Sequence, residues 1–274
     1  MYLTDFVYDG VKLSSLGYLV GNIVSSNNDS ATAGSKLDLQ TVVNRGNNLT
    51  QIITSQYNEP ITATFDIVKY ACTDTADSIV SDKEISYIMR WLNQTEYCKF
   101  YPIYNDLSLP NVYFKGTFTE INTAQLGGNV VGFNVTFTSN APYGFIDYDV
   151  ADMQINASND SCIYFDESDE YGINYPEKMV ITIGQGGNFE LLNELTQKTT
   201  IINNCVTNEV ITFDCIHRII TTSNNEHNTL HKDFNYVFPH LCNTKATREN
   251  VLTSNLPCQI SLTYAPIRKV GIVV

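Results

Sequence analysis

Charged residues are scarce in this chain, and basic residues are the scarcest. Only 16% of the 274 residues are charged, and 16 Lys and Arg face 29 Asp and Glu, so the net charge is −13 and the sequence pI is about 4.6. Nucleic-acid binding depends on basic contacts to phosphate. The composition therefore argues against a nucleic-acid binder and favours a surface that repels DNA.

Long apolar runs and cysteine motifs are also missing. No apolar run approaches the roughly 20 residues of a membrane span, and Met1–Asp5 has neither a basic region nor a long apolar run. We therefore expect no membrane segment, no signal peptide and synthesis in a cytoplasm. The seven cysteines are odd in number and have no C-x-x-C spacing, which favours reduced, mostly buried thiols over disulfides or a zinc site.

No motif with catalytic or ligand-binding spacing stands out. Asp166–Glu170 is the densest carboxylate cluster, and although it could bind calcium or supply an acid and a base, we predict a solvated loop. His227 and His231 are four residues apart but have no Glu in the metalloprotease position, and Gly184–Asn188 lies between strands, so we predict a loop and a turn. The sequence predicts no enzyme, metal or cofactor.

Aromatic and β-forming residues are abundant. The chain has 17 Tyr, 13 Phe and 43% hydrophobic residues, which is typical of a β-rich globular protein. Its length suffices for one large core or two ordinary ones.

The clearest local pattern spans residues 81–144. Ser81 and Glu84 form a capping box before a helix with Ile85, Ile88, Met89 and Leu92 on one face, widened by Tyr87 and Trp91. A β-hairpin follows, with a turn at Gly127–Asn129 and a return strand that alternates strictly. The alternation along the hairpin predicts that the following residues are buried: Val112, Phe114, Phe118, Val131, Phe133, Val135 and Phe137.

The remaining segments predict strands in both halves. The first half has further candidates at residues 3–8, 11–13, 16–20, 37–43, 49–57 and 61–70. The pattern weakens between residues 146 and 158, where we expect the domain boundary. Eight short strands without helical spacers follow, which is typical of a β-sandwich or jelly roll: residues 162–165, 178–184, 189–193, 199–203, 209–214, 217–221, 250–253 and 259–264.

This element order resembles the distal tail protein (Dit) family of long-tailed bacteriophages. In the first half the matching features are Leu16-Gly17, the short helix ending in Trp91-Leu92, the aromatic hairpin and Ala141-Pro142-Tyr143. In the second half they are Tyr175-Pro176, Ile202-Asn203-Asn204, Phe234-Asn235-Tyr236 before Phe238-Pro239, and Tyr264-Ala265-Pro266 with a basic tail. The resemblance covers nearly the whole chain.

The resemblance implies a mainly β fold of two domains. Residues 1–148 would form the N-terminal belt domain, a sandwich or barrel-like sheet with one helix and a long hairpin, and residues 149–274 a galectin-like β-sandwich. The implied function is structural: a homohexameric ring in the virion at the tail tip, which joins the tail-tube protein to a trimeric tail-tip protein, supports receptor-binding protein and lets DNA pass unbound.

Two groups of residues are candidates for contacts in such an assembly. The candidate ring interface is the polar face of the hairpin with the single tryptophan: Trp91, Tyr113, Lys115, Thr117, Thr119, Asn134 and Thr136. For Trp91 the residues themselves favour a core anchor for the helix over an interface anchor. The candidate platform for partners lies in the second half: Tyr171, Tyr175, Tyr236, Arg268 and Lys269.

Three other functions stay open at the level of sequence. A carbohydrate-binding module would use exposed aromatic residues such as Tyr171, Tyr175 and Tyr236 with convergent polar groups. A β-rich hydrolase would need Asp166 or Asp169 opposite a second carboxylate in a cleft. A tail-tube subunit would share the helix and hairpin but normally lacks a second sandwich.

Overall fold

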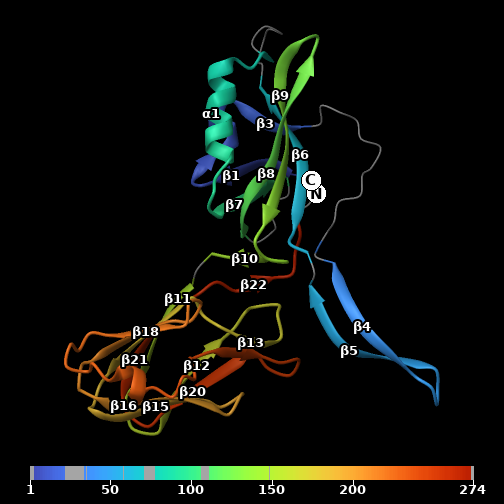
Figure 1. Cartoon of the computed structure of the whole chain (residues 1–274). Helices are drawn as coiled ribbons and strands as arrows, with labels where there is room; N and C mark the ends of the chain where they lie inside the picture. The colour runs from blue at the N-terminus through green and yellow to red at the C-terminus, as the bar shows by residue number, and fades with distance from the viewer. Residues whose placement is uncertain are drawn as a thin grey trace. The chain divides into compact units, whose positions relative to one another are not determined.

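The computed structural model divides into two compact units (Figure 1). It describes residues 3–21, 34, 36–57, 59–70, 78–105, 111–147 and 149–272. One unit comprises Met1–Ile146 with Arg268–Val274, and the other comprises Asp147–Ile267. The chain terminus thus belongs to the first unit, whereas the sequence assigned residues 268–274 to the second, and the buried Ile272 in the first core gives the reason.

The first unit is built mainly from strands. Its elements in chain order are β1 (Leu3–Tyr8), β2 (Val11–Lys12), the 3-10 helix η1 (Leu13–Leu16), β3 (Tyr18–Gly21), β4 (Leu37–Asn44), β5 (Leu49–Tyr57), β6 (Thr62–Lys69), α1 (Asp82–Leu92), β7 (Cys98–Tyr104), β8 (Val112–Leu126), β9 (Asn129–Ser139) and β10 (Gly144–Ile146).

The main sheet of this unit is antiparallel and has the strand order β2-β1-β7-β8-β9-β6-β3. Its longest pairing is the predicted hairpin of β8 and β9, which turns at Gly127 and Gly128. Both glycines have positive φ, at 61° and 84°, as a tight hairpin turn between right-twisted strands requires.

Helix α1 packs against an aromatic core. The predicted capping box is confirmed, because Ser81 accepts from the Glu84 amide and Glu84 accepts from the Ser81 amide. Trp91 is 7% exposed, stacks on Phe6 at 5.8 Å and donates its indole N–H to the Tyr8 carbonyl. Tyr87 is 49% exposed, so its prediction as part of the buried stripe is wrong; the core-facing stripe is narrower than the sequence suggested.

The aromatic core lies between the helix and the sheet. Phe6 and Phe118 contact Phe100 at 5.1 and 6.1 Å, and Phe100 stacks on Phe137 at 4.5 Å. Such offset and edge-to-face pairs add to the free energy gained from burying the rings. This cluster joins the N-terminal strand to elements about 100 residues away.

The second unit is a sandwich of two sheets. Its elements are β11 (Asp149–Ile155), β12 (Asp160–Phe165), β13 (Gly172–Asn174), β14 (Lys178–Ile183), β15 (Gly187–Asn193), β16 (Lys198–Cys205), β17 (Val210–Asp214), β18 (Ile219–Thr222), α2 (Leu230–Asp233), β19 (Leu241–Asn243), β20 (Glu249–Ser254), β21 (Cys258–Tyr264) and β22 (Ile267–Arg268), the last of which ends in the first unit.

The two sheets have the strand orders β11-β21-β14-β17-β18 and β12-β20-β15-β16. Inward residues of both, such as Ile181, Phe189, Leu252 and Ile260, form one buried cluster. All eight strands predicted for this half are present. The sequence prediction missed β11, which occupies the region expected to be irregular, and also β13, β19 and the one-turn helix α2.

Among the described residues, no helix is long and apolar enough to cross a membrane. The six cysteines in the described ranges are all free thiols, and Cys72 lies outside those ranges. Burial raises the pKa of the Cys205 and Cys215 thiols to about 12, so both remain protonated and unreactive at neutral pH.

Gly116 in β8 gives a test of this packing. A methyl group added there would lie 2.4 Å from the Phe137 ring and from the Thr138 carbonyl oxygen. We expect Gly116→Ala to lower the free energy of unfolding of the first unit by about 1–3 kcal/mol through overpacking, as measured by urea denaturation. Gly46→Ala is the control, because its added methyl meets nothing closer than 3.5 Å; equal losses in both variants would contradict the packing described.

Candidate assembly interface

Among the described elements, the hairpin of β4 and β5 exposes the most large apolar residues. It pairs with no other described strand and forms a two-stranded sheet of its own. Seven of its large apolar residues are exposed: Leu37, Leu39, Val42, Val43, Leu49, Ile52 and Ile53. A two-stranded ribbon without a covered face is marginally stable in water at best, so this hairpin needs a surface to pack on.

The register of the hairpin divides these residues between its faces. Cross-strand partners share a face, and the pairs are Leu37–Tyr57, Leu39–Ser55, Thr41–Ile52 and Val43–Thr50 on one side. The other side has the pairs Asp38–Gln56, Gln40–Thr54, Val42–Gln51 and Asn44–Leu49, and Ile53 occupies a bulge. One face is therefore mainly apolar and the other mainly polar, the pattern of a strand pair that packs on a partner through one side.

The long β8–β9 hairpin has fewer unpaired backbone N–H and C=O groups than a hairpin without neighbouring strands would have. β6 pairs along β9, and β7 and β10 pair with residues 112–116 of β8. In the described ranges, the segment from Thr119 to Leu126 has a strand neighbour on one side only, namely β9. The first third of β8 is therefore paired through β7 and β10, and β7 was not predicted from the sequence.

The predicted ring-interface residues divide between core and surface. Trp91 and Tyr113 are buried, and the Tyr113 ring packs on Phe145 at 5.7 Å. Lys115 and Thr117 are half-buried, and Thr117 donates its hydroxyl to the Gln94 carbonyl at 2.7 Å. Tyr113 and Lys115 therefore lie in the part of β8 that pairs with β10 or β7, Thr117 lies just beyond that part, and Trp91 belongs to α1.

The other three residues belong to a polar face shared by β6, β8 and β9. The Thr119 and Thr138 hydroxyls are hydrogen-bonded at 2.9 Å, and those of Thr64 and Thr136 at 3.0 Å. Asn134 donates to the Asp66 carboxylate at 2.7 Å. Hydroxyl and amide groups thus cover the part of this face that these residues form.

The predicted platform residues do not form one cluster. Tyr171 lines a pocket of the second unit, whereas the Tyr175 ring is covered by the Arg218 guanidinium at 3.7 Å. Tyr236 packs on Phe234 at 5.4 Å and donates its hydroxyl to the His231 carbonyl. Arg268 and Lys269 belong to the terminal segment grouped with the first unit.

Asp166 is a buried structural carboxylate, and its predicted place in a solvated loop is wrong. It is fully buried and accepts hydrogen bonds from the Ser168 amide, the Asn174 side chain and the Tyr264 hydroxyl. Burial, followed by the nearby Asp166 charge, raises the pKa of Tyr264, which keeps this hydroxyl a donor. The local sequence gave no signal for this buried role of Asp166, because one of its hydrogen-bond donors, Tyr264, lies far along the chain.

A buried histidine of the same unit lies beside two carboxylates. The His227 Nδ1 lies 2.7 Å from Glu209 Oε1 and its Nε2 lies 3.3 Å from Asp233 Oδ2. Burial alone would raise the pKa of Glu209, but hydrogen bonds from Thr222, the Val206 amide and His227 outweigh it and hold that pKa below its ordinary value. Among the described residues there is no group of three His, Cys, Asp or Glu side chains arranged to hold a metal ion. The segment around His227 lies outside the helices and strands, in agreement with the predicted loop, and the burial of the His227 side chain was not predicted.

Replacing His227 tests whether this network stabilises the second unit. In His227→Ala the buried Glu209 carboxylate would keep its hydrogen bonds from Thr222 and the Val206 amide but lose the one from His227. We expect a loss of about 1–3 kcal/mol in the free energy of unfolding. His217→Ala is the matched control, because His217 lies 2.8 Å from Asp214 but is 71% exposed, against 2% for His227. Thermal and urea denaturation give the comparison, and similar small losses in both variants would contradict a structural role for His227.

Comparison with known proteins agrees with these features. A family model described as the phage tail protein N-terminal domain matches residues 1–141, and one described as the phage tail C-terminal domain matches residues 143–264. No match emerges among curated proteins.

Two solved structures show the likeness in fold. The chain is similar to the SPP1 Dit protein (gp 19.1), described as a paradigm of the hub adsorption apparatus in phages that infect Gram-positive bacteria, with 13% identity and a TM-score of 0.63 over 96% of this chain and 99% of that one. The phage P2 baseplate in its activated conformation with calcium contains a chain with 8% identity and a TM-score of 0.47, covering 96% of this chain and 98% of that one. The mainly β fold of the Dit type is thus shown, and the chain belongs to the phage tail protein family.

Proposed function

We propose that this chain is a distal tail protein that closes into a homohexameric ring at the tip of a phage tail. The ring would join the tail tube to the tail-tip proteins and take part in assembly and DNA passage without catalysis. The family membership and the Dit-like fold support this role. The number six follows from the Dit resemblance.

The single observation that supports self-association most strongly is the amphipathic hairpin of β4 and β5. Its apolar face, with Leu37, Leu39, Val43 and Ile52, is exposed in the isolated chain. In a homo-oligomer, a second copy of the same chain would cover this apolar face. Contact between this face and a different surface of the next copy is heterologous, and a heterologous contact that repeats around an axis closes a ring.

The unpaired side of β8 supports the same arrangement. Backbone groups of Thr119–Leu126 that face away from β9 are available to a strand or loop of a neighbouring copy. Sheet edges of this kind are commonly completed by pairing between chains. The ring contact would thus combine apolar burial at one surface with backbone hydrogen bonds at another.

The polar face of β6, β8 and β9 suits the bore of the ring. Hydroxyl and amide groups of Thr64, Thr119, Asn134 and Thr136 can contact water without attracting phosphate, and Asp66 adds an acidic group. A bore of this composition lets DNA slide, since binding would need basic side chains. The two rims would dock the tail-tube protein and a trimeric tail-tip protein, and the second unit would support receptor-binding protein.

The oligomeric state tests the proposal through the two faces of one hairpin. We expect the wild-type chain to form hexamers at micromolar concentration, and Leu39→Asp with Ile52→Asp to leave folded monomers, because the contact would then bury charge. Native mass spectrometry and light scattering give the mass. Gln40→Asp with Gln51→Asp adds the same charge to the polar face and should keep the hexamer; a monomeric wild type, or hexamers in both variants, would contradict the proposal.

DNA affinity tests the orientation of the polar face. We expect the hexamer to show no binding to a short duplex at physiological salt, and Thr64→Lys with Thr119→Lys to create salt-sensitive binding, because it would place 12 ammonium groups in the bore. Fluorescence anisotropy of a labelled duplex provides the measurement. Thr199→Lys with Thr212→Lys in the second unit adds the same charge elsewhere, so equal DNA binding by the two variants would place the polar face outside the bore.

A further inference from the structure

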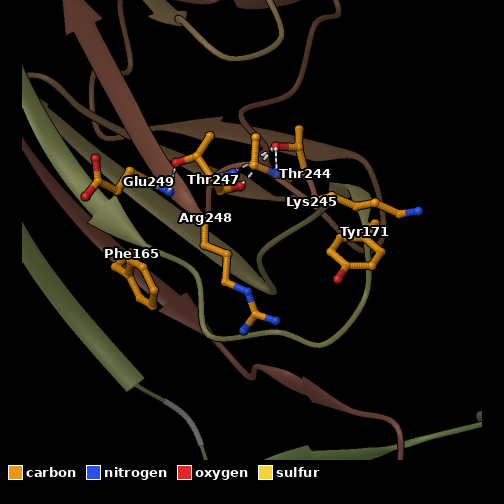
Figure 2. Close-up of a pocket in the computed structure, with 8 residues that line it drawn as sticks. Phe165, Tyr171, Thr244, Lys245, Thr247, Arg248 and Glu249 are labelled. Carbon is orange, nitrogen blue, oxygen red and sulfur yellow. Dashed lines mark hydrogen bonds between the residues drawn. The ribbon is translucent and has the colours of Figure 1, made fainter.

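The second unit contains a pocket whose lining is separate from the hairpin and the β8 segment of the proposed ring contact. It has a volume of about 410 Å³ and is lined by Phe165, Tyr171, the turn that joins β19 to β20 (residues 244–248) and Glu249 at the start of β20 (Figure 2). Small-molecule sites commonly measure roughly 300–1,000 Å³, so the space suits one or two sugar-sized units.

The turn that forms one wall is fixed by its own hydrogen bonds. The Thr244 hydroxyl accepts from the amides of Ala246 and Thr247 at 3.2 and 3.1 Å, and the Thr244 amide donates to the Thr247 carbonyl at 3.0 Å. The Arg248 carbonyl in turn accepts from the buried Asp166 amide at 3.0 Å. A wall held in this way loses little conformational entropy when a ligand binds.

Two aromatic rings and two cations meet at the pocket. Phe165 is 55% exposed and Tyr171 is 48% exposed, and in the view of Figure 2 the Arg248 side chain extends between them while Lys245 lies beside Tyr171. Within the described ranges neither Lys245 nor Arg248 makes an ion pair. Arg248 donates to the Glu167 carbonyl at 3.3 Å, which leaves most of its five N–H donors available.

This combination has a definite chemical preference. A guanidinium matches carboxylate and phosphate through paired hydrogen bonds. Exposed aromatic faces provide flat apolar surface for the C–H groups of a sugar ring, and the Glu249 carboxylate and threonine oxygens can accept from ligand hydroxyls. Two cations in one pocket also contrast with the chain's net charge of −13.

We propose that this pocket binds a saccharide or polyol unit that bears a phosphate or carboxylate group, as part of an anionic polymer on a bacterial surface. The source of the ligand rests on the proposed place of the chain at the tail tip, whereas the chemistry of the pocket does not. The aromatic rings would stack on the sugar or polyol carbons, Arg248 and Lys245 would bind the anionic group, and Glu249 would select ligands rich in hydroxyls.

Calorimetric titration of the full chain tests the proposal with four probes: a glycerol-phosphate trimer, a galacturonic acid trimer, neutral maltotriose and a short acidic peptide. We expect one or both anionic oligomers to bind more tightly than maltotriose and the peptide, and the affinity to fall as salt rises. The two oligomers distinguish phosphate from carboxylate. Arg248→Gln and Phe165→Ser should each weaken the binding about tenfold, since each removes a contact worth more than 1 kcal/mol.

Matched variants and a fold measurement complete the experiment. Lys232→Gln and Tyr97→Ser alter an exposed cation and an exposed ring elsewhere and should leave the affinity unchanged, and circular dichroism verifies that every variant is folded. Absence of binding by both anionic oligomers, unchanged affinity in Arg248→Gln, or preference for the peptide would each overturn the proposal. Mass measurement on the same samples separates the two hypotheses, because hexamers that bind no sugar refute only the pocket and sugar-binding monomers refute only the ring.

Discussion

Burial of apolar side chains is the interaction on which the structure depends, and one hairpin lacks it. In the first unit an aromatic core around Phe6, Phe100 and Phe118 joins the helix to the sheet and covers most of the apolar side chains. The β4–β5 hairpin is the exception among the described elements, because one of its faces presents Leu37, Leu39, Val43 and Ile52 to solvent. Water penalises such a surface, which is why the proposed function has a second copy of the chain cover it.

The two units divide the work of the proposed function. The first unit has the hairpin, the unpaired side of β8 and the polar face with Asn134 and Thr136, which together suit a ring around DNA. The second unit buries polar side chains that contact one another, Asp166 with Tyr264 and His227 with Glu209. A rigid sandwich of that kind suits a platform, and its surface pocket gives it a separate binding chemistry.

The sequence predicted those elements that are determined by residues close together in the chain. Three features depend only on residues a few positions apart, and each is present in the structure: the Ser81–Glu84 capping box, the paired glycines at 127 and 128, and the alternation after them. Strand β7 was missed because Pro102 and polar neighbours interrupt its pattern, and β11 because Asp149 and Asp152 suggested a loop.

The features that define the candidate sites depend on distant residues. Asp166 is buried by Tyr264, 98 positions away, and the pocket brings Phe165 and Tyr171 next to Arg248. The apolar stripe of β4–β5 is invisible until the bulge at Ile53 fixes the register, since without it the two strands would present different partners. No single-sequence pattern contains this information, because register and long-range packing decide it.

Site-specific photo-crosslinking tests most directly whether a second copy covers the hairpin. With a benzophenone amino acid in place of Val43, on the apolar face, the account predicts covalent products that form a ladder from dimer to hexamer, with crosslinks to a surface outside the hairpin of the neighbouring chain. The same probe in place of Thr54, on the polar face, should crosslink weakly. Crosslinks confined to a single chain at position 43 would contradict the account, because the hairpin would then be covered by its own molecule.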